Sequence, residues 1–229
     1  MSIPLDKPNI VVPVTDTATL REITDSRDVQ PWDIVEIRVD RIPEINQFCS
    51  EISSISAPVL LTCRHPDEGG FNELHDPHKR HDLLAPLIPY AAAIDIEIAS
   101  ASQMTQTISL AKNSGLTLIL SAHDFSGTPQ NKQLHSMVNN GIENGADTIK
   151  IATTTENPDA LCRLFSLFKE FPNQSLSLMG MGQLGMASRL IAAQSGSILN
   201  YAALKEANAT GQWPVQEFRD LLHRAGIVD

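Results

Sequence analysis

The run Leu116-Thr-Leu-Ile-Leu-Ser-Ala-His123 is short, apolar and rich in strand formers, and Ala146-Asp-Thr-Ile-Lys-Ile-Ala152 is a second run of the same kind. Apolar residues between the two runs recur at i, i+3, i+4, i+7 and i+8, the spacing of one face of an α-helix. They are Leu134, Met137, Val138, Gly141 and Ile142. Parallel neighbouring strands require a crossover connection, usually a helix. This segment therefore predicts a β-α-β unit with two parallel strands.

The same alternation extends over the whole chain of 229 residues. Six further runs of strand formers bring the predicted strands to eight: residues 9–14, 33–40, 57–64, 93–98, 175–179 and 197–201. Helical spacing recurs over residues 161–168 and after Pro214. Eight such units favour a closed (β/α)8 TIM barrel of the α/β class, and an open doubly wound sheet is the alternative. No linker-like composition interrupts the chain, so we expect a single domain over residues 1–229.

The composition argues against several classes of protein. Lys and Arg number 17 against 27 Asp and Glu, which gives a net charge of −10, and we therefore expect no nucleic-acid partner. No apolar run approaches the roughly 20 residues of a membrane span, and no signal-peptide pattern opens the chain. The odd, widely spaced Cys49, Cys63 and Cys162 are typical of reduced thiols rather than of a disulfide framework. We expect a cytoplasmic protein without membrane association.

Charged residues stand near the ends of the predicted strands, where TIM-barrel enzymes carry out their chemistry. Glu36, Arg38 and Asp40 alternate with apolar residues, so they are predicted to share one face of the second strand. Because the neighbouring strands are apolar on both sides, we expect these charges to face the barrel interior. Buried charges require partners. The residues alone allow either a functional group of charges or a structural ion-pair network.

Polar residues also end the third, fourth and fifth strands. Asp95 and Glu97 share a face of the fourth strand, and Ser121 and His123 share a face of the fifth. A histidine at a strand end beside several carboxylates is a candidate general base, although a structural polar group is an equally good interpretation. The third strand ends at Arg64, and the Gly-rich turn after it carries Glu68.

Lys150 is the most informative single residue because it lies inside the apolar run Thr148-Ile-Lys-Ile-Ala152. Lysine is almost never fully buried unless it is paired. One interpretation is a structural lysine that pairs with a carboxylate or extends to the rim of the barrel. The other is a nucleophile that forms a Schiff base, for which the amine must become neutral.

Two further patterns are weak indications of function. The segment Gly180-Met-Gly-Gln-Leu-Gly185 matches G-x-G-x-x-G, but the next predicted strand lacks the acidic residue of a dinucleotide site. We therefore predict no nucleotide cofactor. His75, His78 and His81 lie in a highly polar stretch whose spacing spreads them around a helix, which favours a solvated face over a metal site.

Taken together and in order, the strand-end motifs resemble those of type I 3-dehydroquinate dehydratases, and the resemblance covers nearly the whole chain. The motifs are Glu36-x-Arg38-x-Asp40, Arg64-x-x-x-Glu68-Gly-Gly, Ser121-x-His123-Asp-Phe125, Lys150-Ile-Ala and Met179-Gly…Ser188-Arg189. The resemblance implies a TIM barrel that dehydrates 3-dehydroquinate to 3-dehydroshikimate in the shikimate pathway. It also implies that the enzyme needs neither a metal nor a cofactor, and that it forms a homodimer.

The resemblance also implies roles for individual residues. Lys150 would form an imine with the substrate ketone. His123 would remove the adjacent C2 proton and later protonate the departing hydroxyl, while Glu68 would orient His123. The implied substrate-binding residues are Glu36, Arg38 and Arg64 around the ring hydroxyls, Arg189 and Gln212 at the carboxylate, and Asn208 in the loop after the eighth strand.

The sequence departs from the family pattern in two places. The loop that usually reads Ser-x-Pro-Gly-Gln is here Asn208-Ala-Thr-Gly-Gln212, and Pro13 stands where some relatives carry a serine. We expect activity to survive these changes with weaker substrate affinity. Two alternatives remain open: a Schiff-base aldolase that acts on sugar phosphates, and a barrel that binds small carboxylates without catalysis.

Overall fold

Eight parallel strands form one sheet in the computed structural model, which describes residues 3–26, 29–71, 73–205 and 210–228. Each strand pairs with its sequence neighbour, so the order along the sheet is β7-β6-β5-β4-β3-β2-β1-β8. The strands are β1 (Asn9–Val14), β2 (Ile34–Arg38), β3 (Val59–Thr62), β4 (Ala93–Glu97), β5 (Thr117–Asp124), β6 (Thr148–Thr154), β7 (Leu176–Met181) and β8 (Leu199–Tyr201).

Hydrogen bonds between the two ends of this sheet close it into a barrel. The backbone N–H of Ile198 donates to the Leu176 carbonyl at 3.0 Å, and the Ser177 hydroxyl donates to the Leu199 carbonyl at 2.7 Å. The closure confirms the predicted TIM barrel and excludes the open doubly wound sheet.

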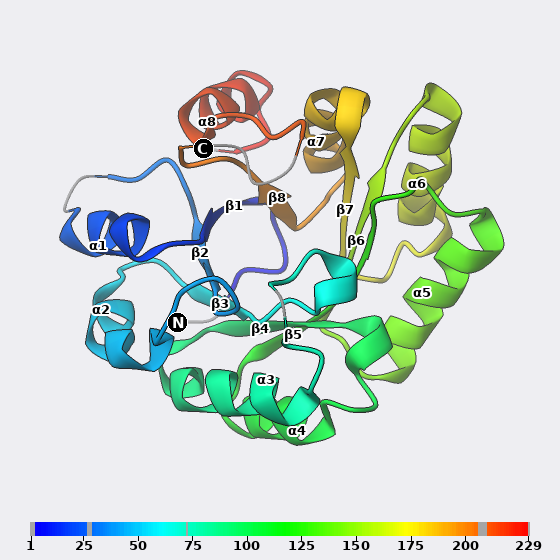
Figure 1. Cartoon of the computed structure of the whole chain (residues 1–229). Helices are drawn as coiled ribbons and strands as arrows, with labels where there is room; N and C mark the ends of the chain where they lie inside the picture. The colour runs from blue at the N-terminus through cyan, green and yellow to red at the C-terminus, as the bar shows by residue number, and fades with distance from the viewer. Residues whose placement is uncertain (1–2, 27–28, 72, 206–209, 229) are drawn as a thin grey trace.

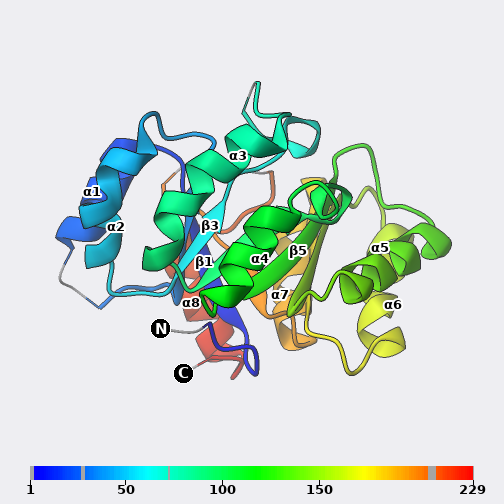
Figure 2. The ribbon, with the colours of Figure 1, turned by 90° about the horizontal axis from the view of Figure 1, so that it is seen from below.

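Helices surround the strands, as Figure 1 shows, and Figure 2 shows α3 and α4 side by side in front of β3 and β5. The α-helices are α1 (Thr17–Asp25), α2 (Cys49–Ser54), α3 (Pro77–Leu84), α4 (Thr105–Asn113), α5 (Asn131–Glu143), α6 (Pro158–Glu170), α7 (Gly185–Gln194) and α8 (Val215–Arg224). Short 3-10 turns are η1 (Ile45–Phe48), η2 (Pro66–Glu68), η3 (Ala85–Tyr90), η4 (Ile98–Ser100) and η5 (Gly182–Leu184).

The predicted helices form for the expected physical reasons. In α5, Leu134 and Val138 are fully buried on the face that packs against the barrel. Helix α6 begins with Pro158, and the Asn157 side chain caps it by accepting a hydrogen bond from the backbone N–H of Ala160 at 2.9 Å.

The barrel interior changes from apolar to polar along the strand direction. Ile34 precedes Glu36 on the inner face of β2, and Ala93 and Ile119 precede the polar residues of β4 and β5. An apolar cluster therefore fills the N-terminal end of the barrel. The charged side chains gather at the C-terminal ends of the strands, which positions the candidate site.

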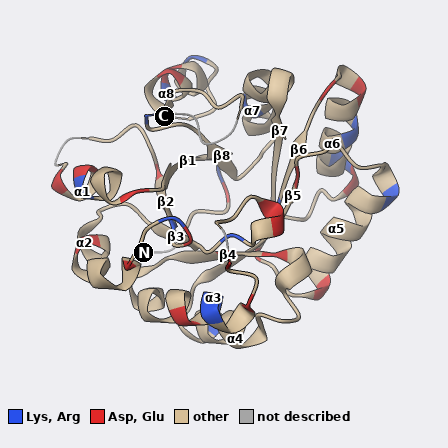
Figure 3. Ribbon diagram, in the orientation of Figure 1, with Lys and Arg blue, Asp and Glu red and all other residues tan. Residues whose placement is uncertain are grey.

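The outer surface carries charges of both signs. Figure 3 shows acidic and basic residues interspersed over the surrounding helices. Within the described ranges, no helix combines the length and the apolar character that crossing a membrane requires.

Candidate active site

A cavity of about 290 Å³ opens at the C-terminal ends of the strands. It is lined by Pro13, Glu36, Arg38, Arg41, Arg64, Glu68, Gly69, His123, Phe125, Lys150, Ala152, Met179, Met181, Arg189, Tyr201 and Gln212. Every predicted site residue that the structure describes is therefore brought to one cavity. Asn208 lies outside the described residues.

The Lys150 amine lies at the wall of this cavity and has two close polar partners. Its Nζ donates to Asp95 Oδ2 at 2.8 Å and to the Tyr201 hydroxyl at 3.0 Å. The same nitrogen lies 4.4 Å from the centroid of the Tyr201 ring and 4.0 Å from Glu36 Oε1. The lysine is thus paired with a carboxylate, as one interpretation of the sequence required. The pairing leaves the second interpretation open, because the amine is also exposed to the cavity.

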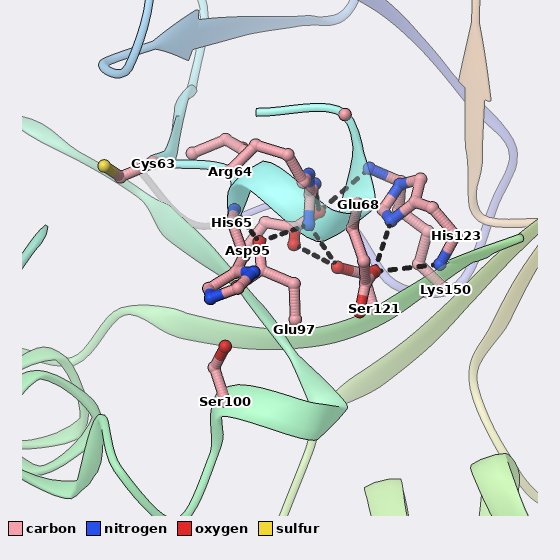
Figure 4. Close-up of polar contacts among 12 residues, drawn as sticks. Cys63, Arg64, His65, Glu68, Asp95, Glu97, Ser100, Ser121, His123 and Lys150 are labelled. Atoms are coloured by element: carbon pink, nitrogen blue, oxygen red, sulfur yellow. Dashed lines mark hydrogen bonds and ion pairs between the residues drawn. The ribbon is translucent and has the colours of Figure 1, made fainter. Parts of the chain in front are cut away.

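Arg64 follows the end of β3 and shares the partner Asp95 with this lysine inside the barrel, as the close-up in Figure 4 shows. Its guanidinium contacts Asp95 Oδ2 at 3.0 Å and donates to Glu97 Oε1 at 2.9 Å and to the Ser121 hydroxyl at 2.6 Å. Burial alone would raise the pKa of Asp95, but Arg64 and Lys150 outweigh it and hold that pKa well below its usual range. Asp95 therefore stays ionised between two cations.

Arg80 in α3 completes the buried charge network from outside the barrel. It forms an ion pair with Glu97, and its Nε donates to the Cys63 carbonyl at 3.0 Å. Arg80 is 1% exposed although it lies in a polar stretch of sequence. The acids Glu36, Asp95 and Glu97 balance the cations Arg64, Arg80 and Lys150 in this network.

His123 and Glu68 form a second, partly buried pair beside the lysine (Figure 4). Glu68 Oε2 accepts the backbone N–H of His123 at 2.9 Å and lies 3.0 Å from its Nδ1. Burial, with Arg64 and Lys150 nearby, lowers the pKa of His123 well below its usual value. Burial also raises the pKa of Glu68 to about 7, against the opposing charge of Arg64. With Nδ1 turned to Glu68, the imidazole presents Nε2 as its remaining ring nitrogen.

The three charges of the second strand separate into two groups. Strand β2 ends at Arg38, so Asp40 lies beyond it rather than on its face, and the prediction of one shared strand face is wrong for Asp40. Arg38 donates to Asp40 through Nε at 2.9 Å and through Nη2 at 2.7 Å. Glu36 instead accepts from the Thr62 hydroxyl at 2.8 Å and from the Tyr201 hydroxyl at 3.1 Å.

Arg189 in α7 is a buried cation that pairs with the backbone rather than with a carboxylate. Its Nη1 donates to the carbonyls of Gly180, Gly185 and Gly211 at 3.0, 3.0 and 2.7 Å. Among the buried cations in the described part of the chain, it alone has no acidic partner. Burial lowers the pKa of Arg189 to about 10, so the group remains charged. An uncompensated buried cation at a cavity wall is suited to an anionic ligand.

The loop after β8 packs against the start of α7 through two glycines. A side-chain carbon on Gly211, whose φ is +87°, would lie 2.6 Å from the Cα of Gly185. The backbone N–H of Gly182 also donates to the Thr210 carbonyl at 3.2 Å. This close approach holds Gln212 at the cavity, where the sequence resemblance predicts it.

Ligand-capable side chains also meet outside the cavity. Asp67 lies 3.7 Å from Nδ1 of His65 and 4.0 Å from Nδ1 of His75. Within the residues that the structure describes, these three form the one group whose atoms lie close enough together to hold a metal ion. Asp67 and His75 are exposed, and none of the three lines the cavity.

Several residues that the structure brings to the site are not among the predicted site residues. For Asp95 and Glu97 the sequence predicts only a shared strand face, although a carboxylate in an apolar strand is itself an indication of an interior partner. Tyr201 ends β8, where its position at a strand end could have identified it. Nothing in the polar sequence around Arg80 distinguishes it from a solvated arginine.

A cavity at the C-terminal ends of barrel strands, lined by a lysine and a histidine–carboxyl pair, is characteristic of barrel enzymes. The sequence model described as Type I 3-dehydroquinase matches residues 10–229. The chain belongs to this family of enzymes.

Individual relatives agree with this assignment. The 3-dehydroquinate dehydratase of Aquifex aeolicus is 30% identical over 217 residues, which is 93% of this chain and 96% of the relative. The crystal structure of the Aquifex aeolicus enzyme superposes with a TM-score of 0.83 at 29% identity, covering 94% of this chain and 97% of that one. The type I enzyme of Clostridium difficile, solved with covalent modified comenic acid, has a TM-score of 0.79 at 26% identity and covers 96% and 94% of the two chains.

Proposed function

We propose that the protein dehydrates 3-dehydroquinate to 3-dehydroshikimate through an imine on Lys150. The observation that carries the proposal is the meeting of three features in one small cavity: the Lys150 amine, the His123–Glu68 pair and the cation Arg189, which has no acidic partner. The family membership supports the substrate, and the covalent ligand of the Clostridium difficile relative supports covalent chemistry.

The imine explains why a lysine is needed. The Lys150 amine attacks the ketone carbon, and loss of one water leaves a protonated imine. A protonated imine is a stronger electron sink than the ketone, so the neighbouring C2 proton becomes easier to remove. Expulsion of the hydroxyl then gives the conjugated product imine. Hydrolysis consumes one water and releases the product, so the net change is the loss of one water.

We assign to His123 the transfer of the C2 proton in this series of reaction steps. Its lowered pKa keeps the imidazole neutral, and Glu68 holds Nδ1, so Nε2 is the base that removes the C2 proton. The resulting imidazolium returns that proton to the departing hydroxyl, which leaves as water. Glu68 thus orients the base and stabilises its charged form.

The remaining cavity residues would bind the substrate. Arg189 would bind the carboxylate, with Gln212 beside it, while Glu36 and Arg38 would contact ring hydroxyls. Arg64 lines the cavity, but its guanidinium already binds Asp95, Glu97 and Ser121. We therefore assign it chiefly to the electrostatic balance of the site. A role for Asn208, the homodimer and a single catalytic domain over residues 1–229 stay predictions.

Turnover of purified protein with 3-dehydroquinate tests this proposal directly. The expected result is the appearance of the ultraviolet absorbance of a conjugated enone. When borohydride is added to reduce the imine, a stable adduct should also appear in the mass of the protein. Turnover of a sugar phosphate would favour the aldolase alternative. Tight binding of 3-dehydroquinate without product or adduct would show a barrel that only binds carboxylates.

Replacing Arg189 with lysine is expected to raise the KM for 3-dehydroquinate about 10- to 100-fold and to change kcat much less. Lysine keeps the charge but loses the forked hydrogen bonds that suit a carboxylate. The matched control is Arg163→Lys, because Arg163 also donates to backbone carbonyls but lies outside the cavity. An unchanged KM in Arg189→Lys would contradict the carboxylate assignment.

Replacing Glu68 with glutamine is expected to shift the acid limb of the pH profile of kcat/KM to lower pH. The base-competent state needs ionised Glu68 to accept the Nδ1 proton of His123. Because the pKa of Glu68 is raised to about 7, this state is present above that pH and is lost as the pH falls through it. Glutamine cannot titrate, so only His123 limits the variant, and its pKa lies below the usual value. An acid limb that stays near 7 in Glu68→Gln would refute this assignment.

A further inference from the structure

The Tyr201 hydroxyl bridges the Lys150 amine and the Glu36 carboxylate, which are too far apart to share a hydrogen bond. It accepts from Lys150 Nζ at 3.0 Å and donates to Glu36 Oε1 at 3.1 Å. The direct separation between Nζ and Oε1 is 4.0 Å, beyond hydrogen-bond reach. Tyr201 is 5% exposed and Glu36 is 3% exposed, so protein rather than bulk water connects them.

We propose that Tyr201 relays a proton between Lys150 and Glu36 during imine formation, an inference that rests on the proposed function. In the paired state the lysine carries a proton that it must lose before Nζ can attack a ketone. A hydroxyl that accepts from the donor and donates to the acceptor can pass that proton along without itself becoming charged.

Asp95 is the closer carboxylate, but it is a poor acceptor for this proton. Its Oδ2 already contacts Arg64 at 3.0 Å, and its Oδ1 accepts from the Ser121 hydroxyl at 2.5 Å. Arg64 and Lys150 hold the pKa of Asp95 well below its usual range. A proton on Asp95 would leave the buried Arg64 charge less compensated. Asp95 therefore anchors the lysine instead of deprotonating it.

Glu36 is the better acceptor because the groups that hydrogen-bond to it are neutral hydroxyls. Within the described ranges no arginine forms a salt bridge with Glu36, and the Thr62 hydroxyl donates to its Oε1 at 2.8 Å. Burial and the Glu36 and Asp95 carboxylates raise the pKa of Tyr201 well above its usual value. The phenol therefore remains protonated between transfers and returns to the same state after each one.

The transfers balance over the formation of the imine. An N–H bond of the Lys150 ammonium breaks as an O–H bond forms on Tyr201, while the original phenol O–H breaks and an O–H bond forms on Glu36. The neutral amine adds to the ketone carbon. A second N–H proton moves to the former ketone oxygen, and the proton held by Glu36 protonates it again as it departs. The ammonium and the ketone thus yield a protonated imine and one water.

Replacing Tyr201 with phenylalanine tests the relay because it removes the hydroxyl and keeps the ring against Lys150. The expected result is a fall of about 10- to 100-fold in the rate at which borohydride traps the imine, with KM changed by less than about twofold. The matched control is Tyr90→Phe, since Tyr90 is an exposed tyrosine outside the cavity. Equal melting temperatures would show that all the variants are folded.

Two further measurements separate a relay from a structural role. In mixtures of H2O and D2O, the trapping rate of the parent protein should depend non-linearly on the deuterium fraction because two protons move together. In Tyr201→Phe this curvature should be absent. In a Glu36→Gln background, which removes the acceptor, Tyr201→Phe should cause little further loss.

Either of two results would overturn the relay while leaving the dehydratase proposal intact. One is an imine-trapping rate in Tyr201→Phe equal to that of the parent. The other is an equal fractional loss of the trapping rate from Tyr201→Phe in the parent and in the Glu36→Gln background. Failure of the parent protein itself to trap or turn over 3-dehydroquinate would overturn the proposed function, and the relay with it.

Discussion

Replacing Lys150 with methionine is expected to abolish the adduct that borohydride reduction of the imine produces, and to lower kcat at least about 10⁴-fold. Methionine approximates the aliphatic part of the lysine side chain but has no amine to attack the ketone. Without the imine, the C2 proton must be removed from a bare ketone, and His123 alone cannot compensate. The measurement is intact mass after incubation with 3-dehydroquinate and borohydride, combined with steady-state turnover.

The control for this experiment is Lys132→Met, because Lys132 is exposed on α5. It should keep both the adduct and the turnover. Loss of Lys150 also removes one partner of Asp95, but Arg64 continues to pair with that carboxylate. Folding should therefore be retained, and a melting curve verifies it. A persistent adduct in folded Lys150→Met would place the imine on another lysine.

Replacing His123 with glutamine is expected to lower kcat about 10³- to 10⁴-fold while the protein still forms a trappable adduct. Glutamine keeps a hydrogen-bonding side chain beside Glu68 but cannot accept and return a proton near neutral pH. Lys150 remains a nucleophile, so the substrate still forms the imine. The imine then loses its C2 proton slowly. Single-turnover measurements that follow adduct and product separately would show accumulation of the substrate imine.

His135→Gln is a close control, because His135 also pairs with a glutamate, Glu170, but on the outer surface. This variant should turn over like the parent. Loss of both adduct and turnover in folded His123→Gln would mean that the histidine acts before imine formation, contrary to the assigned role. Full turnover in His123→Gln would remove the histidine from the mechanism altogether.

Much of the fold and many site positions follow from local sequence pattern. Runs such as Ala146–Ala152 alternate with helical segments, and a parallel barrel is a compact way to bury eight such units. Strand period then places Glu36 with Arg38, and Ser121 with His123, on common faces. Because parallel strands end at the same rim, the polar strand ends predict a shared site even before the strand order is known.

The sequence by itself therefore determined the barrel, the rim that carries the site and, through its motifs, the family to which the chain belongs. Only the tertiary structure decided which charges pair. Lys150 donates a hydrogen bond to Asp95, which lies 55 positions earlier in the chain. Tyr201 donates a hydrogen bond to Glu36, which lies 165 positions earlier. Such contacts depend on how strands stagger around a closed barrel and on rotamers chosen under burial. Local periodicity contains no information about either, so the uncompensated Arg189 and the bridging hydroxyl of Tyr201 emerge only when the barrel closes.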